Sequence, residues 1–490
     1  MARNWNLISI SVLGEIFFST LGMAQERPNV VIIMTDEHNF RTLGCYREQL
    51  PPGQAFPWGK DVKVETPNID ALAHQGALCL NYYAAHPVSG PSRGCFMTGL
   101  YPQKHGVTTN NLSLKDEVVT FAATLAENGY STGYFGKWHL DGASKPGWKP
   151  ERQFGFADNR YMYNRGHWKK LSDKRGEPEI TGLNAQGKPA ENVLGNADEK
   201  SFATDFMTDR ALRFITDNKN KPFCCFLSIA DPHGPNLVRT PYSEMYTHLN
   251  IDHPHSASAD VKHMPSWAQK SKRTLVDAAP RNGIAQYLGM VKCIDDNVGK
   301  VVRCLQNLDL SKNTIIIFTA DHGDLLGEHG RDNKGVPFEG SAKIPFIWFY
   351  PDKVTAGSLI RVPMNNTDFT PTLLGLMDID SRERYQGKDY SRVITGGKKD
   401  SDCITIFKGQ EWIASTDGRY KLIYSAGRQE IPVLFDLSED PNELVNIYQH
   451  KENKGIIKKL AAYLKNYCLT CEEPFWNNEK IRSEISYYLK

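Results

Sequence analysis

The sequence has no excess of charge of either sign. Among its 490 residues, 58 Lys and Arg stand against 56 Asp and Glu, which gives a formal net charge of +2. A protein that binds a bulk polyanion through its overall charge carries a strong basic excess. The sequence therefore does not indicate nucleic acid as a partner, and any attraction to an acidic substrate must come from local clusters of basic side chains.

The sequence also lacks the two CxxC pairs that are typical of a zinc site, and it contains no internal repeat or low-complexity tract. Most of its ten cysteines are scattered. Cys224 and Cys225, for example, lie in an apolar run, where burial as small hydrophobic side chains is expected. Cys468 and Cys471 are closely spaced, so they form either a disulfide in an oxidising compartment or two free thiols.

The apolar run at the amino terminus, residues 7–23, is slightly short for a membrane span, and Glu15 interrupts it. A basic residue precedes the run, and small residues around Ala24 offer a cleavage site, which is the pattern of an export signal. No cysteine follows Ala24 to accept a lipid. We expect residues 1–24 to be a signal peptide of an exported protein, periplasmic or secreted, without stable membrane insertion; an uncleaved anchor is the alternative.

Short apolar runs alternate with helical patterns along most of the chain. Runs bounded by turn or polar residues predict buried parallel strands over 30–34, 131–135, 223–229, 314–319 and 346–350. Between them, apolar residues at steps of three and four predict helices, including a long one over 287–305. This alternation predicts an α/β fold with a large, doubly wound, mostly parallel sheet flanked by helices. Ligands of such sheets bind at the carboxyl ends of the strands.

Two segments depart from this pattern. Residues 145–200 are polar and rich in Gly, Asn and Lys, and we expect either a solvated insertion or a lid that shapes a substrate pocket. Basic and aromatic residues are embedded in this segment: Arg160, Tyr161, Tyr163, Arg165, His167 and Trp168. After Gly396, short strand patterns and a helical pattern over 456–467 predict a small carboxyl-terminal α+β subdomain over 397–490.

The segment SGPSRGCFMTG, from Ser89 to Gly99, combines a hydroxyl side chain, a rigid proline and a fixed cation. Pro91 suits the first turn of a helix, whose free N–H groups and positive dipole end favour an anion. Arg93 has a planar set of donors that can hold an oxyanion at two points. An unmodified serine hydroxyl is a weak nucleophile unless a base or a metal activates it. The segment therefore indicates an anion site in which Ser89 requires activation.

Charged side chains and histidines follow the predicted strands directly. Asp36 and Glu37 follow the first strand, and Asp321 and His322 follow the strand over 314–319. Two adjacent acids repel each other, but they suit a hard divalent cation that prefers oxygen ligands. The other such positions are Lys137, His139, Asp231 and His233, with Lys334 further along the chain.

The segment from Ser89 resembles the signature of type I, formylglycine-dependent sulfatases of the alkaline phosphatase superfamily. That signature reads Cys or Ser, any residue, Pro, Ser, Arg and, after four more residues, Thr-Gly. The strand-end residues also occur in the order of that family. The run DHG followed by LGEHG over 321–330 is similar to the branch that includes iduronate sulfatase. Serine at position 89 resembles the bacterial forms that an anaerobic radical enzyme matures.

The resemblance implies that Ser89 is oxidised to formylglycine, whose hydrate attacks sulfur, and that a formylglycine-generating maturase is a partner during biogenesis. It also implies a divalent cation, which is Ca²⁺ in most of the family, with Mg²⁺ or Mn²⁺ left open by a histidine ligand. The implied metal ligands are Asp36, Glu37, Ser89, Asp321 and His322. Glu37 is a departure, because the family has a second aspartate at this position.

The resemblance assigns roles in catalysis to six residues. Ser89 is the precursor of the nucleophile, and Arg93, Lys137 and Lys334 stabilise the transferring group. His233 protonates the leaving oxygen, and His139 removes the proton that triggers sulfate release. Histidine suits both proton transfers because its unperturbed pKa lies near neutrality.

Together these observations predict an exported sulfatase that hydrolyses sulfate monoesters. Export and the basic aromatic segment favour a carbohydrate substrate, such as a glycosaminoglycan or mucin-type glycan. Residues 25–396 would form the catalytic domain, with 145–200 as a variable insertion near the substrate pocket. Two alternatives stay open. One is a phosphonate monoester or phosphodiester hydrolase of the same superfamily, and the other is a non-catalytic binder of sulfated glycans whose Ser89 is never oxidised.

Overall fold

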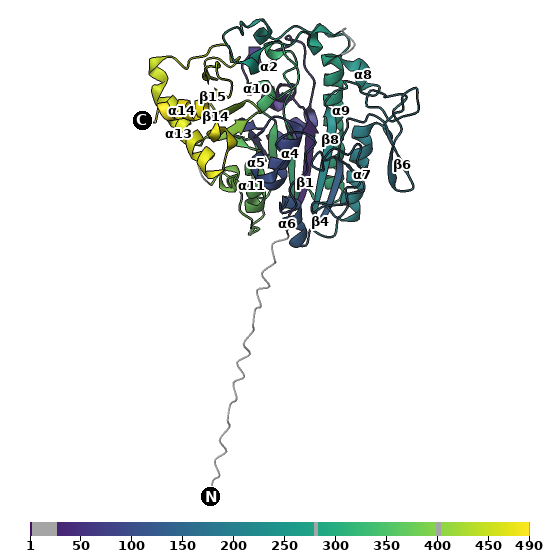
Figure 1. The fold of residues 1–490 in the computed structure, drawn as a ribbon. Coiled ribbons are helices and arrows are strands. Elements are labelled where there is room, and N and C mark those ends of the chain that lie inside the picture. Colours follow the sequence, from purple (N-terminus) through teal and green to yellow (C-terminus); the bar gives the residue numbers. More distant parts are fainter. Residues whose placement is uncertain (2–26, 279–282, 382, 398–402, 490) are drawn as a thin grey trace.

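The computed structural model describes residues 1, 27–278, 283–381, 383–397 and 403–489 (Figure 1). The predicted signal peptide therefore lies, apart from Met1, outside the described residues. Within those residues, no helix combines the length and the apolar character that a bilayer crossing requires.

An eight-stranded mixed sheet forms the centre of the molecule, in the order β11-β2-β10-β9-β1-β8-β4-β5. Its middle consists of parallel strands, and the pairing of β1 with β8 changes register between Met34 and Asp36. These four strands are β9 (Thr314–Ala320), β1 (Asn29–Asp36), β8 (Phe223–Pro232) and β4 (Ser131–Lys137). The flanking strands are β11 (Ser358–Ile360), β2 (Ala77–Cys79), β10 (Phe346–Phe349) and β5 (Met162–Tyr163). The predicted mostly parallel α/β sheet is confirmed.

β10 runs antiparallel to both of its neighbours, β9 and β2, so the prediction of a parallel strand over 346–350 was wrong. A parallel strand requires a crossover that returns the chain to the opposite end of the sheet. Here the connection stays at the carboxyl end of β9, where the N–H of Gly323 donates to the carbonyl of Ser341. The chain therefore enters β10 from the end at which it left β9. Hydrophobic pattern alone does not encode this direction.

Helices cover both faces of the sheet (Figure 1). One face packs against α3 (Pro67–His74), α7 (Ala203–Asp217) and α9 (Ile284–Asn307). The other packs against α4 (Ser89–Thr98), α6 (Phe121–Glu127) and α11 (Phe369–Leu376). Alternate residues of β1 point to the two cores, Val31 and Ile33 to the first and Ile32 to the second. This alternation accounts for the apolar run over residues 30–34 of the strand.

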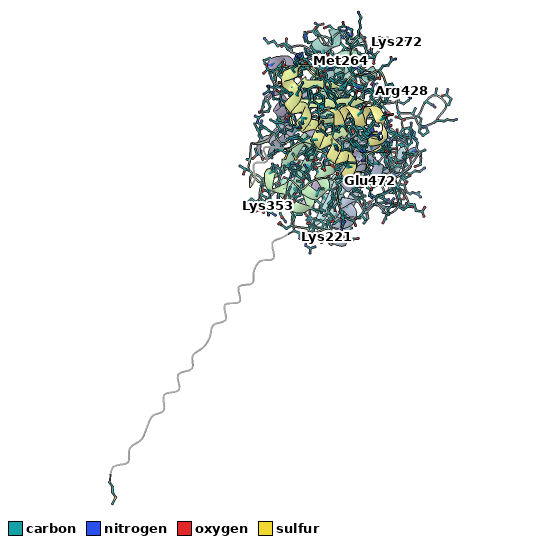
Figure 2. The ribbon with its side chains drawn as sticks, turned by 60° about the vertical axis from the view of Figure 1, so that its left-hand side comes forward. Lys221, Met264, Lys272, Lys353, Arg428 and Glu472 are labelled. Atoms are coloured by element: carbon teal, nitrogen blue, oxygen red, sulfur yellow. The ribbon has the colours of Figure 1, made fainter. Side chains whose placement is uncertain are left out.

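A second, antiparallel sheet lies near the carboxyl terminus and packs against helices, which are yellow in Figure 1. Figure 2 labels Arg428 and Glu472 in this part of the chain. Leu460 and Leu464 of its long helix pack with Ile413 and Leu422 of the strands. Its elements are β13 (Thr405–Lys408), β14 (Trp412–Thr416), β15 (Tyr420–Ser425), β16 (Val433–Asp436), α13 (Lys454–Thr470) and α14 (Glu479–Tyr487). Sequence patterns missed β14 and α14. Cys468 and Cys471 are both free thiols in the structure.

Shorter elements connect these layers. The short helices are α1 (Gly44–Arg47), α2 (Pro52–Ala55), α5 (Pro102–His105), α8 (Tyr242–Met245), α10 (Glu339–Ala342) and α12 (Ser391–Ile394). Two small strand pairs are β3 (Tyr82–Tyr83) with β12 (Met364–Asn365), and β6 (Leu171–Lys174) with β7 (Glu177–Ile180).

Candidate active site

The central strands β9, β1, β8 and β4 end at one edge of the sheet, as parallel neighbours must. β1 ends at Asp36, with Glu37 next, and β4 ends at Lys137. Asp321 and His322 directly follow β9. All five side chains are buried, although charged residues are almost never fully buried without a partner. The carboxyl ends of the strands therefore bring together charged residues from segments that are far apart in the sequence.

Helix α4 brings Ser89 to the same edge. The helix begins at Ser89, has Pro91 in its first turn as predicted, and ends at Thr98, followed by Gly99, whose φ of 67° forms a left-handed cap. Ser89 Oγ lies 2.9 Å from Nε2 of His322. The hydroxyl of Ser92, about one helical turn after Ser89 in α4, donates to the backbone carbonyl of Asp321. These two contacts place residue 89 beside the acids and histidine that follow β9.

Arg93 is fully buried, and its guanidinium binds two of the acids. Its Nε donates to Asp321 Oδ2 at 2.8 Å, and its Nη2 donates to Asp36 Oδ2 at 3.1 Å. Its Nη1 donates to the Lys137 carbonyl. Burial opposes the charge, but Asp321 and Asp36 outweigh it and raise the pKa of Arg93 further above its usual range. Arg93 therefore compensates the two carboxylates and fixes their geometry.

Lys137 is the last residue of β4, and His139 lies two residues after it. Lys137 Nζ donates to Asp36 Oδ2. Burial disfavours the charge of Asp36, yet Lys137 and then His233 hold the pKa of Asp36 well below its usual range. Burial, reinforced by Lys137, lowers the pKa of His139, so its ring is neutral at neutral pH. Nδ1 of His139 is buried and has no hydrogen-bond partner among the described residues.

Glu37 turns towards His233 and Lys334. Its Oε2 lies 3.0 Å from His233 Nε2, and its Oε1 lies 3.0 Å from Lys334 Nζ. Lys334 Nζ is also 2.7 Å from His233 Nε2. Burial opposes ionisation of Glu37, but His233 and Lys334 outweigh it and lower the pKa of Glu37. The left-handed backbone at Glu37, with φ of 60°, directs its side chain away from that of Asp36.

Asp36, Asp321 and His322 could together hold a metal ion, since one ligand atom from each lies within 4.8 Å of the others. Oδ1 of Asp36 is buried and has no hydrogen-bond partner among the residues that the structure describes, which is costly unless a cation or donor binds there. Two carboxylates and an imidazole suit a divalent cation. The residues present therefore fit such an ion. Glu37 is not part of this group, because its carboxylate faces His233 and Lys334.

The structure adds His167 to the site, a residue that sequence analysis noted only within the segment 145–200. Its ring stacks on His233 with centroids 3.7 Å apart, and its Nε2 lies 2.9 Å from Lys137 Nζ. The neighbouring Tyr163 and Trp168 are buried in the core instead. The density of basic and aromatic residues was the available signal, but it did not single out one side chain.

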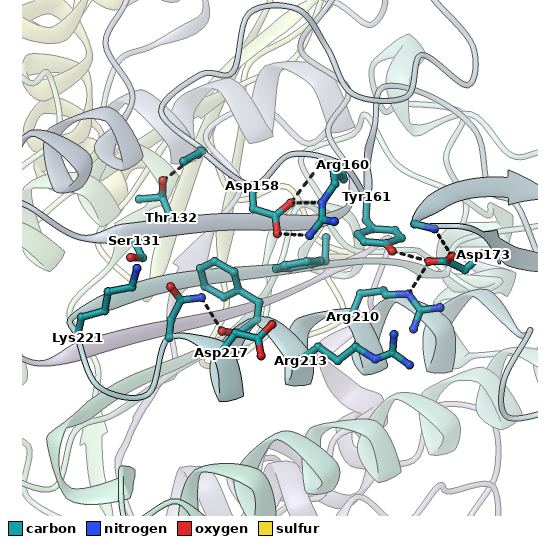
Figure 3. A pocket seen from close by; sticks show the side chains of 15 residues that line it. Ser131, Thr132, Asp158, Arg160, Tyr161, Asp173, Arg210, Arg213, Asp217 and Lys221 are labelled. Atoms are coloured by element: carbon teal, nitrogen blue, oxygen red, sulfur yellow. Dashed lines mark hydrogen bonds and ion pairs between the residues drawn. The ribbon is translucent and has the colours of Figure 1, made fainter.

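A cavity of about 630 Å³ lies beside Ser131, at the opposite end of β4 from Lys137 (Figure 3). Arg160 pairs there with Asp158, and Arg210 lies near Asp173, so most of its charges are balanced internally. None of the strand-end residues above lines this cavity. It is separate from the candidate active site.

Comparison with known proteins decides the family. A model of the sulfatase family matches residues 28–379. The chain belongs to the sulfatase family. A second model, for the carboxyl-terminal part of N-sulphoglucosamine sulphohydrolase, matches residues 327–469. This sulfatase-family enzyme is 26% identical over 523 residues to the N-acetylglucosamine-6-O-sulfatase of Bacteroides thetaiotaomicron, an alignment that covers 90% of this chain and 87% of the relative.

Solved structures show the same fold. One is the structure of a protein in complex with its substrate, D-glucosamine-2-N,6-O-disulfate. It superimposes on this sulfatase-family chain with a TM-score of 0.73 at 22% identity, and the alignment covers 92% of this chain and 99% of the other. The phosphonate monoester hydrolase of Agrobacterium radiobacter superimposes with a TM-score of 0.70 at 22% identity, with coverage of 91% and 96%. The fold is therefore shared by proteins that act on sulfate and on phosphonate esters.

Proposed function

We propose that this enzyme is an exported sulfatase, periplasmic or secreted, that hydrolyses sulfate monoesters of carbohydrates by means of a formylglycine made from Ser89 and a divalent cation. The observation that carries the proposal is the contact of Ser89 Oγ with His322 at 2.9 Å, within the cluster that also contains Asp36 and Asp321. The similarity to an N-acetylglucosamine-6-O-sulfatase supports a sulfated sugar, such as a glycosaminoglycan or mucin-type glycan, as the substrate class.

The balance of charge supports an anionic substrate. Three buried carboxylates, on Asp36, Glu37 and Asp321, are matched by three cations, on Arg93, Lys137 and Lys334. A divalent cation and formylglycine at position 89, when present, supply charge stabilisation and an ionised hydroxyl for attack on sulfur. The added cation leaves an excess of positive charge, which the ionised hydroxyl and a singly charged sulfate monoester would together offset. We propose Ca²⁺, with Mg²⁺ or Mn²⁺ as alternatives.

Arg93, Lys137 and Lys334 would have different roles, which follow from their positions. Arg93 holds Asp36 and Asp321 in place and compensates their charges. Lys137 and Lys334 approach from β4 and from the segment after β9, and each has donors for the oxygens of the transferring group. Charge-assisted hydrogen bonds of this kind are stronger than neutral ones.

Two histidines would handle protons. His233 lies beside Lys334 and Glu37, and with Nε2 protonated it would donate a proton to the leaving alcohol. His139 is neutral and has an unpartnered Nδ1, so it would accept the proton whose removal releases sulfate. The two rings come from different strands, which suits two separate steps.

The test is to express the protein with and without a formylglycine-generating maturase and to measure both the mass of the peptide containing residue 89 and sulfate release from defined sulfated sugars. We expect sulfate release only from protein in which Ser89 has lost two hydrogens. Ser89→Ala should bind the sugar but release no sulfate. Full turnover by protein with unaltered Ser89 would overturn the mechanism, and binding without release by the oxidised protein would favour a glycan binder.

A second candidate, a phosphonate monoester or phosphodiester hydrolase, is favoured by the structural similarity to a phosphonate monoester hydrolase. The same cation and basic side chains would serve a phosphoryl group. Turnover measured on the sulfate and phosphate esters of one alcohol separates the two functions.

A further inference from the structure

His167 contacts two basic groups of the proposed site, Lys137 and His233. Its Nε2 lies 2.9 Å from the ammonium nitrogen of Lys137. Its ring lies flat on that of His233, with an interplanar angle of 11°. One residue of the segment 145–200 therefore touches both the Lys137 and the His233 sides of the site.

Glu191 determines which nitrogen of His167 carries the proton. Its Oε2 accepts the backbone N–H of His167 at 3.0 Å and lies 3.2 Å from Nδ1 of the ring. Lys145 forms an ion pair with the other oxygen of the same carboxylate. A carboxylate accepts only, so Nδ1 carries the hydrogen and Nε2 presents a lone pair to Lys137. Burial, reinforced by Lys137, lowers the pKa of His167, which agrees with a neutral ring.

Counting donors on Lys137 shows what this lone pair does. An ammonium group has three N–H donors and no acceptor. One donor binds Asp36 Oδ2, and a second binds Nε2 of His167. With two directions fixed, the third N–H is left for an oxygen of the bound sulfate.

A buried ion pair holds the segment in place. Lys169 Nζ lies 2.6 Å from Asp231 Oδ1, and both side chains are buried. Thr204 donates to the other oxygen of Asp231 at 2.6 Å. Lys169 follows His167 by two residues, and Asp231 precedes His233 by two, so this pair sets the two rings face to face.

We propose that His167, oriented by Glu191, is a positioning residue of the sulfate site: its Nε2 directs Lys137 towards the substrate, and its ring holds His233 beside the leaving oxygen. This inference rests on the proposed function. The ligand atoms of Asp36, His167 and His233 also lie within 4.8 Å of one another. The ammonium of Lys137 donates to both Asp36 and His167, so a cation already occupies this position and a second metal site is not needed.

The test uses two variants of the matured enzyme that separate the lone pair from the ring. His167→Gln retains an acceptor for Lys137 and loses the flat ring, whereas His167→Phe retains the ring and loses the acceptor. We expect His167→Phe to lower kcat by about tenfold to 100-fold with less than about a threefold change in KM, because a donor is misdirected in the transition state. We expect His167→Gln to lower kcat by less than His167→Phe does, because it keeps the acceptor for Lys137 and loses only the stacking on His233. His248→Phe, at an exposed histidine, is the matched control and should match the wild type.

A second measurement does not depend on turnover. Binding of inorganic sulfate to Ser89→Ala protein is measured by calorimetry in the presence of Ca²⁺, alone and combined with each His167 variant. The Phe variant should bind sulfate at least about threefold more weakly, and the Gln variant should match its parent. Should His167→Phe fail to fold, Glu191→Gln replaces it, and we expect kcat to fall severalfold because the ring loses its fixed tautomer.

The outcomes are distinct. Unchanged kcat and sulfate affinity in His167→Phe overturn the positioning role, and equal losses in the Phe and Gln variants overturn the role of the lone pair. Failure of the matured wild type to release sulfate would instead overturn the proposed function, before any variant is compared.

Discussion

At the scale of single residues, the site consists of buried charges that compensate one another. Asp36 accepts from Lys137 and Arg93 through one oxygen, Oδ2, and its Oδ1 has no hydrogen-bond partner in the described part of the chain. An unpaired buried carboxylate oxygen is costly, so its retention points to a ligand. Glu37 has its own partners in His233 and Lys334. The two adjacent acids therefore serve different neighbours, although the sequence presents them as a pair.

This difference predicts that Asp36 governs cation affinity. We expect Asp36→Asn to weaken Ca²⁺ binding at least about tenfold, because the cluster loses one of two charged oxygen ligands. Calorimetric titration of metal-free protein with Ca²⁺ measures the effect, and removal of the ion by a chelator should abolish turnover. Asp260→Asn, at an exposed aspartate, is the control. Equal affinities of Asp36→Asn and the wild type would exclude Asp36 as a ligand.

At the scale of elements, strands determine where the site is and the segment 145–200 determines part of its shape. The apolar runs and their polar ends predicted the strands β1, β4, β8 and β9 because both features are local in sequence. The segment is different, since His167 reaches the site only because Lys169 pairs with Asp231 near the carboxyl end of β8. No sequence feature near Lys169 predicts that it pairs with Asp231.

The same ion pair predicts a large effect on stability. Lys169→Met would leave Asp231 buried without its cation, and removal of one partner of a buried pair costs about 3 to 5 kcal/mol. We therefore expect a clear fall in Tm, measured by thermal unfolding. Lys170→Met, at the half-buried neighbour that contacts Asn196, should stay within about 0.5 kcal/mol of the wild type. Similar Tm values for the two variants would show that the pair contributes little.

At the scale of the whole molecule, the core contains histidines outside the candidate active site that burial keeps neutral. Burial lowers the pKa of His105 and of His329 from 6.5 to about 3. The unfolded chain binds these protons below pH 6.5, whereas the native state does not bind them until about pH 3. Their contribution to stability is therefore complete above pH 6.5 and is lost as the pH falls towards 3.

The resulting prediction is a fall in Tm between pH 7 and pH 5. At pH 5 each of these histidines lowers the free energy of unfolding by roughly 2 kcal/mol relative to neutral pH. His105→Gln removes one titrating group, so its Tm should depend less steeply on pH than that of the wild type. His74→Gln, at an exposed histidine, should leave the slope unchanged. Parallel curves for His105→Gln and the wild type would contradict the assignment.

The sequence by itself determined the fold class, the four parallel strands in the middle of the central sheet and the residue types at their carboxyl ends. These features are local: periodicity reports burial, and a charged residue directly after a strand lies at the edge of a sheet wherever that strand is placed. Helix α4 was predictable for the same reason, since Pro91 and Gly99 mark its start and end within eleven residues, 89–99. The sulfatase family signature lies within this segment.

Only the tertiary structure decided the direction of β10, the turn of Glu37 towards His233, and the entry of His167 into the site. Each depends on contacts between segments distant in sequence, and hydrophobic pattern contains no information about them. His167 depends on a buried ion pair between Lys169 and Asp231, 62 positions apart. Such a pair is favourable only when both partners are desolvated together, which happens once the sheet and the segment 145–200 have packed.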